Sequence, residues 1–143
     1  VAWNDENPNG AVSSTLAHSK TVIGVLPTEK HGFIIVHSIP KYPAFIGTKV
    51  NMTINTSELI YGQHALCMTV PLTTLETMAI SQLIIRPNVY HATVGSWSPS
   101  LYNLGQMNYG NSSNTFENHV MVLNLITSVK SIYKNNMVNS SIF

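Results

Sequence analysis

The sequence predicts an α/β protein, a mixed sheet with flanking helices, because two hydrophobic periods alternate along it. Short apolar runs rich in β-branched residues occur at 22–26, 33–36 and 65–70, and polar or turn-forming residues bound each run. Two longer stretches, 72–86 and about 117–134, repeat apolar residues at helical spacing. With 143 residues the chain is long enough for one hydrophobic core, so residues 1–143 are predicted to form a single domain.

The first two apolar runs are predicted to pair as a hairpin. The run at 22–26 ends at Pro27, and the run at 33–36 (Phe-Ile-Ile-Val) follows a turn-forming Glu-Lys-His-Gly sequence. Residues 27–32 are therefore expected at the tip. The polar segments 1–15, 44–63 and 94–113 predict loops.

The third strand, 65–70, contains Cys67, the one cysteine of the chain. The apolar neighbours predict a buried, inert thiol. In a secreted chain, an odd cysteine instead suggests a missing partner.

Each predicted helix has a start signal. Thr73 and Glu76 form a capping box for the first helix, which should end before Pro87. The Asn-Thr-Phe-Glu sequence at 114–117 is expected to cap the second. The first helix carries its apolar stripe on Leu72, Leu75, Ala79 and Leu83, and the second on Val122, Leu125, Ile126, Val129, Ile132 and Tyr133.

Charge is unusually sparse in this chain. Charged residues make up 9%, against about 25% in ordinary soluble domains, and the net charge at pH 7 is +1. These values argue against a polybasic nucleic-acid arm, an acidic tail and charge-driven disorder. Protonating all six histidines would add six charges and raise the net charge to +7, so the chain is expected to be cationic in an acidic compartment.

Several features bear on cellular route. No apolar run reaches the roughly 18 residues that a membrane span needs, so no membrane association is expected. The chain begins Val-Ala-Trp rather than with Met, which suggests a processed chain or a fragment. Four Asn-x-Ser/Thr sequons, at Asn51, Asn55, Asn111 and Asn139, favour secretion and glycosylation, although an Asn/Ser/Thr-rich chain also generates sequons by chance.

One short motif combines groups suited to phosphoryl chemistry. His18 and Lys20 stand two residues apart at the entrance to the first strand, where alternation would point both to one face. The ammonium would neutralise phosphate oxygens, and the imidazole would attack phosphorus or move a proton. Taken alone, the pattern is more typical of a solvated strand edge than of a catalytic site. The six histidines include no pair four apart, so the zinc-helix spacing is absent.

The wider order of motifs resembles the N-terminal half of the deoxyribonuclease II family, within the phospholipase D-like superfamily. The resemblance covers about residues 2–92, and 93–143, predicted as loop plus helix, match only weakly. Its most specific parts are the Val-His-Ser-Ile-Pro-Lys-Tyr-Pro run at 36–43 and the Tyr-Gly-Gln…Leu-Cys run at 61–67. The Asn-Asp-Glu run at 4–6 and the His-Ser-Lys run at 18–20 precede these in the same order.

The resemblance implies one half of a phospholipase D-like pseudo-dimer, in which each half supplies one His-x-Lys motif. It implies a secreted or lysosomal acid endonuclease without a metal or other cofactor. On this resemblance, DNA would be cleaved through a phosphohistidine to leave 3′-phosphate ends. His18 would then be the catalytic imidazole, Lys20 the phosphate clamp, and His37 a possible supporting residue.

Four departures from the family pattern count against activity. No second His-x-Lys occurs in residues 21–143. The family's cysteine-bearing opening strand, which would supply a partner for Cys67, is absent. Leu26 and Pro27 stand where the family has an acidic residue, with Glu29 in the nearby turn. Thr21 replaces a small glycine and is expected to crowd a phosphate.

Three interpretations therefore remain open. A homodimer, or a missing C-terminal half on a longer chain, would complete an active nuclease. Alternatively, the chain is a catalytically inactive, secreted glycoprotein that acts in binding or interaction. The third interpretation is a truncated product that folds poorly, because the surface that would pack against the other half of the pseudo-dimer is exposed.

Overall fold

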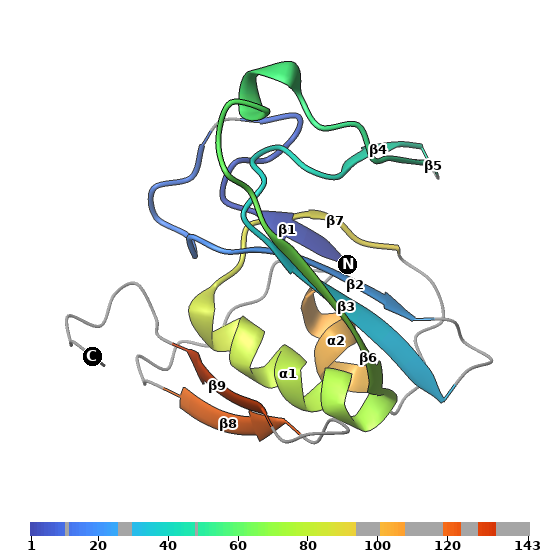
Figure 1. Cartoon of the computed structure of the whole chain (residues 1–143). Coiled ribbons are helices and arrows are strands. Elements are labelled where there is room, and N and C mark those ends of the chain that lie inside the picture. Colours follow the sequence, from blue (N-terminus) through green and yellow to red (C-terminus); the bar gives the residue numbers. More distant parts are fainter. Residues whose placement is uncertain are drawn as a thin grey trace.

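The computed structural model describes residues 1–10, 12–25, 30–47, 49–93, 101–107, 119–123 and 129–133. Its central feature is a five-stranded sheet in the order β6-β3-β2-β1-β7 (Figure 1). The strands are β1 (Ala2–Asn4), β2 (Lys20–Val25), β3 (His31–His37), β6 (Ala65–Pro71) and β7 (Val89–His91). Every neighbouring pair in this sheet is antiparallel.

Two helices cover one face of the sheet. Helix α1 (Leu72–Ile85) lies against β3 and β6, and α2 (Tyr102–Gln106) packs against α1 (Figure 1). The core between these layers includes Trp3, Ile23, Ile34, Val70, Leu75, Leu104 and Met107. A second hairpin, β8 (His119–Leu123) with β9 (Val129–Tyr133), contacts α1. The predicted combination of a sheet with flanking helices is confirmed.

The other face of the sheet is partly covered by a small hairpin. It consists of β4 (Ala44–Ile46) and β5 (Lys49–Asn51), followed by the 3-10 turn η1 (Thr56–Glu58). These elements and β1 correct the prediction of loops over 44–63 and 1–15. The strands β1, β4 and β5 have only three residues each, which is too short for a hydrophobic period to be visible in the sequence.

The three predicted strands are confirmed as β2, β3 and β6, and the first two form the predicted hairpin. Their register runs from Thr21 opposite Val36 to Val25 opposite Gly32. Residues 26–29 at the predicted tip lie outside the described residues. Cys67 is exposed, which corrects the prediction of a buried thiol. It lies on β6, the edge strand, opposite Ile35 on the face turned away from α1.

The first predicted helix is confirmed as α1, but its predicted capping box is wrong. Pro71 occupies the N-cap and makes no side-chain capping bond. Glu76 instead accepts hydrogen bonds from the backbone N–H groups of Asn103, at 2.5 Å, and Leu104, at 3.1 Å. A Glu inside α1 therefore satisfies unpaired N–H groups at the start of α2.

The second predicted helix is wrong, because β8 and β9 occupy most of residues 117–134. These strands are rich in β-branched residues, which favour strands over helices. A stretch with frequent apolar residues fits the helical period by coincidence, and here the strand propensity of its residues prevails. Helix α2 also corrects the loop predicted at 94–113, of which only 101–107 are described.

Gly24 gives a direct test of how the open face of the sheet is packed. A Cβ atom there would lie 2.2 Å from the Phe33 ring, so Gly24→Ala should destabilise the fold by about 1–3 kcal/mol. Urea unfolding measures the loss of stability caused by Gly24→Ala. This loss should vanish when Phe33 is also replaced by Ala, because the ring that the new Cβ would meet is gone. Gly62→Ala is the control, because no atom lies within 4 Å of its Cβ. Equal costs for Gly24→Ala in both backgrounds would contradict this packing.

Candidate active site

The candidate site lies where β1 ends beside the start of β2. Asn4 and Lys20 are direct partners across these antiparallel strands. Asp5 follows β1 and His18 precedes β2, so the strand pairing brings both next to Lys20. This pairing is non-local, because 15 residues separate Asp5 from Lys20 along the chain.

His18 is exposed, and a buried carboxylate holds one side of its ring. Its Nδ1 lies 2.6 Å from Oδ2 of Asp5. The side chain of His18 is 85% exposed and that of Asp5 is 3% exposed. With Nδ1–H donating to the carboxylate, the neutral ring carries its lone pair on Nε2. The geometry therefore directs a nucleophilic nitrogen toward solvent.

Lys20 binds the second oxygen of the same carboxylate. Its Nζ donates to Oδ1 of Asp5, and its side chain is only 7% exposed. A buried ammonium requires such a partner, since removing one member of a buried ion pair typically costs 3–5 kcal/mol. The predicted pair His18 and Lys20 is thus brought together through Asp5, which the sequence analysis noted only within the Asn-Asp-Glu run.

The family pattern has an acidic residue at the end of β2, where this chain has Leu26 and Pro27. Residues 26–29, including Glu29, lie outside the described residues. The carboxylate that contacts the motif comes instead from the end of β1. Two signals could have identified it: the scarcity of acidic residues, six in all, and an aspartate directly after a possible short strand.

Neighbouring hydrogen bonds hold this arrangement in place. The buried Asn4 side chain donates from Nδ2 to the carbonyls of Ile39, at 3.1 Å, and Tyr42, at 3.2 Å. Its Oδ1 accepts from the N–H of Glu6 at 2.9 Å. These bonds fasten the loop after β3 to the end of β1.

A buried tryptophan fixes the residue between His18 and Lys20. The indole N–H of Trp3 donates to the Ser19 hydroxyl at 3.0 Å, and Trp3 is fully buried. The backbone that carries both motif side chains is therefore anchored to the core.

Thr21 does not lie where it would crowd a phosphate. Side chains alternate along β2, so Thr21 shares a face with Ile23, which lies in the core, and points away from the face of Lys20. Thr21 is 5% exposed. The predicted crowding is therefore wrong.

His37 lies at the end of β3 on the same sheet face as Lys20, and it is 5% exposed. Its Nδ1 accepts from the N–H of Ile39 at 3.2 Å, and the Tyr42 ring meets it edge-on at 5.5 Å. Its Nε2 is buried, with no hydrogen-bond partner among the described residues.

Burial lowers the pKa of His37 from 6.5 to about 4, and the positive charge of Lys20 acts in the same direction. Burial also lowers the pKa of His91. His37 therefore stays neutral in a mildly acidic compartment. The expectation that all six histidines become charged together is corrected for this residue.

Ser38 connects the two segments that carried the family resemblance. Its hydroxyl donates to Oε1 of Gln63 at 2.6 Å and accepts from the N–H of His64 at 3.0 Å. The backbone N–H of Ser38 donates to the His64 carbonyl, also at 3.0 Å. The specific sequence of both segments thus has a structural role beside Lys20 and His37.

The remaining predicted residues are the four sequon asparagines. Asn51 and Asn55 are exposed, and each side chain accepts from the backbone N–H two residues further on. Asn111 and Asn139 lie outside the described residues. Within the parts of the chain that the structure describes, no group of three or more His, Cys, Asp or Glu is arranged to hold a metal ion. No described helix is long and apolar enough to cross a membrane.

Comparison with known proteins identifies the class. The model of the family described as Deoxyribonuclease II matches residues 1–143, and so includes the segment beyond 92. Deoxyribonuclease-2-beta of Mus musculus is 30% identical over 97 residues, which cover 67% of this chain and 26% of that protein. The chain belongs to the deoxyribonuclease II family. The match spans about a quarter of the length of this curated relative.

The depressed pKa of His37 predicts how stability depends on pH. The unfolded chain binds a proton at His37 below about pH 6.5, whereas the folded chain does so only below about 4. The contribution of His37 to the free energy of unfolding is therefore fully present above pH 6.5. It decreases by up to about 3 kcal/mol as the pH falls to about 4. His37→Asn retains an acceptor near the Nδ1 position and should flatten this part of the profile.

Urea unfolding at several pH values measures the effect. The exposed His31→Asn is the matched control, and its profile should keep the slope of the wild type. A His37→Asn profile as steep as that of the control would rule out a buried neutral His37.

Proposed function

We propose that this chain supplies one His-x-Lys half-site of a metal-independent acid endodeoxyribonuclease. The observation that carries the proposal is the pair of contacts from one buried carboxylate, which directs His18 Nε2 outward and holds Lys20 beside it. Family membership supports DNA as the substrate. No metal or other cofactor enters the proposed mechanism.

In the proposed reaction, His18 Nε2 attacks the phosphorus of a phosphodiester. A nitrogen–phosphorus bond forms, and the bond from phosphorus to the leaving 5′ oxygen breaks. Asp5 accepts from Nδ1–H throughout and stabilises the positive charge that the ring gains on attack. Water then cleaves the phosphohistidine and leaves a 3′-phosphate end.

Lys20 is proposed as the phosphate clamp. The ammonium of Lys20 contacts Asp5 and is almost buried. Its positive charge would therefore stabilise the phosphate from the protein side of the site. His37 is a proposed supporting residue, since a neutral ring at this position adds no second charge beside Lys20. Its contact with Tyr42 and its bond to Ile39 hold the loop that Asn4 also binds.

The leaving oxygen needs a proton from a second acid. The sequence holds one His-x-Lys motif, and its curated relative is much longer. We assign the acid to a second motif, either on a second copy of this chain in a two-fold dimer or on the remainder of a longer protein. This arrangement corresponds to the pseudo-dimer of the phospholipase D-like superfamily.

The proposed location is lysosomal or extracellular. The exposed sequons Asn51 and Asn55 are the proposed glycosylation sites in the described region, and Asn111 and Asn139 are proposed from their sequence alone. An inactive, secreted glycoprotein of the same family is the alternative. It is favoured by the single motif and by the low exposure of Lys20.

Plasmid nicking tests the activity. Full-length protein should nick supercoiled DNA near pH 5 in the presence of EDTA, and His18→Ala should abolish the nicking because the nucleophile is lost. His31→Ala is the control, since His31 is exposed and does not contact Asp5 in the structure. Absence of nicking by protein verified to contain two motifs would favour the inactive alternative.

Replacing Asp5 tests the orientation of His18. Asp5→Asn should lower kcat by on the order of 100-fold or more, because an amide binds the ring nitrogen less strongly and does not fix its tautomer. Asp5→Glu should restore part of the activity. The phosphohistidine trapped on labelled DNA by an alkaline denaturing quench should fall in parallel, while circular dichroism at the assay pH confirms folding. Unchanged kcat in folded Asp5→Asn would contradict the assigned role.

A further inference from the structure

We propose that Lys41 and Arg86 bind the two backbone phosphates that flank the phosphodiester attacked by His18. This inference rests on the proposed function and deepens it, because it assigns two DNA-binding residues outside the His-x-Lys motif. Among the residues that the structure describes, Lys41 and Arg86 are the two non-glycine residues with a positive φ, at 55° and 60°.

A positive φ is unfavourable for a residue with a long side chain. In the left-handed conformation Cβ lies too close to a neighbouring carbonyl, and only glycine avoids this contact. Arg86 ends α1 in this conformation, for which glycine is the residue most commonly used. Two basic side chains thus occupy positions where glycine would be less strained. Strain of this kind clusters at active sites and ligand clamps.

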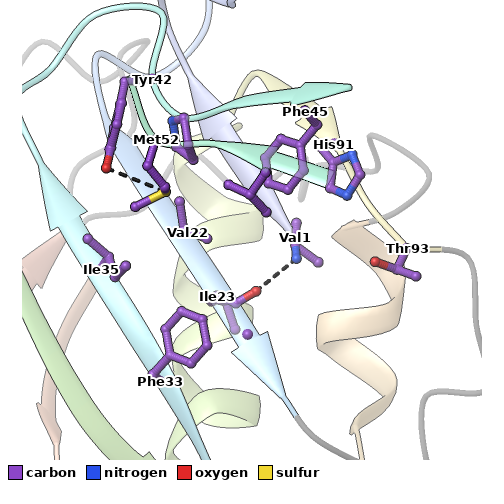
Figure 2. A pocket seen from close by; sticks show the side chains of 13 residues that line it. Val1, Val22, Ile23, Phe33, Ile35, Tyr42, Phe45, Met52, His91 and Thr93 are labelled. Atoms are coloured by element: carbon purple, nitrogen blue, oxygen red, sulfur yellow. Dashed lines mark hydrogen bonds between the residues drawn. The ribbon is translucent and has the colours of Figure 1, made fainter. Parts of the chain in front are cut away.

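The backbone of Lys41 is bonded to the chain just after β1. Its N–H donates to the carbonyl of Glu6 at 2.9 Å. The next residue, Tyr42, has its carbonyl bonded to the Asn4 side chain at 3.2 Å. The Tyr42 hydroxyl donates to Sδ of Met52 at 3.5 Å (Figure 2). The backbone at Lys41 is therefore fixed on both sides, while the Lys41 side chain is exposed.

The backbone of Arg86 is bonded to the residue that precedes His18. Its carbonyl accepts from the N–H of Ala17 at 3.1 Å, and Arg86 itself is half-buried. Two residues further on, the Asn88 carbonyl accepts from the N–H of Asn4 at 3.2 Å. The Asn88 side chain donates to the Asn4 carbonyl at 3.1 Å. The end of α1 is therefore fastened to both segments that form the candidate site.

The two cations approach the site from opposite faces of the sheet. Helix α1, which Arg86 ends, covers one face. Asn4 pairs with Lys20 and shares the other face, and its side chain binds the loop that contains Lys41. A DNA backbone that crosses this edge of the sheet would meet Lys41, the candidate nucleophile and Arg86.

The candidate site needs positive charge beyond that of Lys20. The ammonium of Lys20 is balanced by the carboxylate of Asp5, so the site has no net charge while the His18 ring is neutral. Within the described parts of the chain, no carboxylate forms an ion pair with Lys41. Contacts between Lys or Arg and phosphates supply much of the affinity of proteins for DNA, because they release condensed counterions.

The salt dependence of DNA binding tests this assignment. Titrations near pH 5, at several KCl concentrations, follow the anisotropy of a fluorescein-labelled DNA duplex. They use the full-length protein carrying His18→Ala, which prevents cleavage. Lys41→Gly and Arg86→Gly should each reduce the slope of log K against log [KCl] by about 0.9, the value for one phosphate contact. Affinity should fall equally for duplexes of different sequence.

Glycine is the informative substitution, because it removes the charge and also relieves the left-handed backbone. Urea unfolding should show Lys41→Gly at least as stable as the starting protein, which separates lost binding from lost folding. Circular dichroism confirms the folding of Arg86→Gly. Lys41→Arg and Arg86→Lys retain the charge and should retain the slope.

Lys30→Ala is the matched control. It also removes one positive charge, and Lys30 is exposed. Lys30 directly precedes β3, at the end of that strand away from His37. The slope for Lys30→Ala should therefore equal that of the starting protein.

Each outcome decides the matter. Unchanged slopes in both glycine variants overturn this inference, and plasmid nicking that is intact before His18 is replaced leaves the proposed function standing. A change in only one glycine variant, or an equal change in Lys30→Ala, overturns the assignment of a flanking pair. Failure of the starting protein to bind the duplex, together with absence of nicking, overturns the proposed function and this inference with it.

Discussion

The arrangement of the candidate site depends on one buried carboxylate. Asp5 is almost completely removed from water, and burying a charge is costly unless partners compensate it. Lys20 supplies the countercharge, and the exposed His18 ring takes the remaining oxygen. The same contacts therefore satisfy a buried ion and orient the candidate nucleophile. They require β1 to lie beside β2, in the interior of the sheet, where Trp3 and Asn4 hold it.

Burial also lowers the pKa of His37, which lies on the same sheet face as Lys20. A charged His37 would place another cation near Lys20 without a carboxylate of its own, but burial favours the neutral ring down to about pH 4. His37 thus adds no positive charge beside Lys20 in a mildly acidic compartment. The consequence for the fold is unfavourable, because protonation of the unfolded chain withdraws stability as the pH falls.

Local periodicity accounts for what could be predicted from the sequence. The runs that became β2, β3 and β6 have the length and β-branched content of strands. In α1, Leu72, Leu75, Ala79 and Leu83 recur at a spacing that fits a helix. The spacing of His18 and Lys20, together with the family resemblance, suggested both residues. Asp5 escaped prediction because its contacts depend on pairing between β1 and β2, and three residues carry no readable period. The exposure of Cys67 was missed for a similar reason, since edge position is a property of the assembled sheet.

The register of β2 connects the core with the candidate active site. Ile23 and Val25 face the helices, while Lys20, Val22 and Gly24 face the opposite side. A slip of one residue would exchange these sets, burying the ammonium among apolar side chains and exposing Ile23. The energy of core packing therefore fixes where Lys20 meets Asp5, and also where Gly24 leaves room for the Phe33 ring.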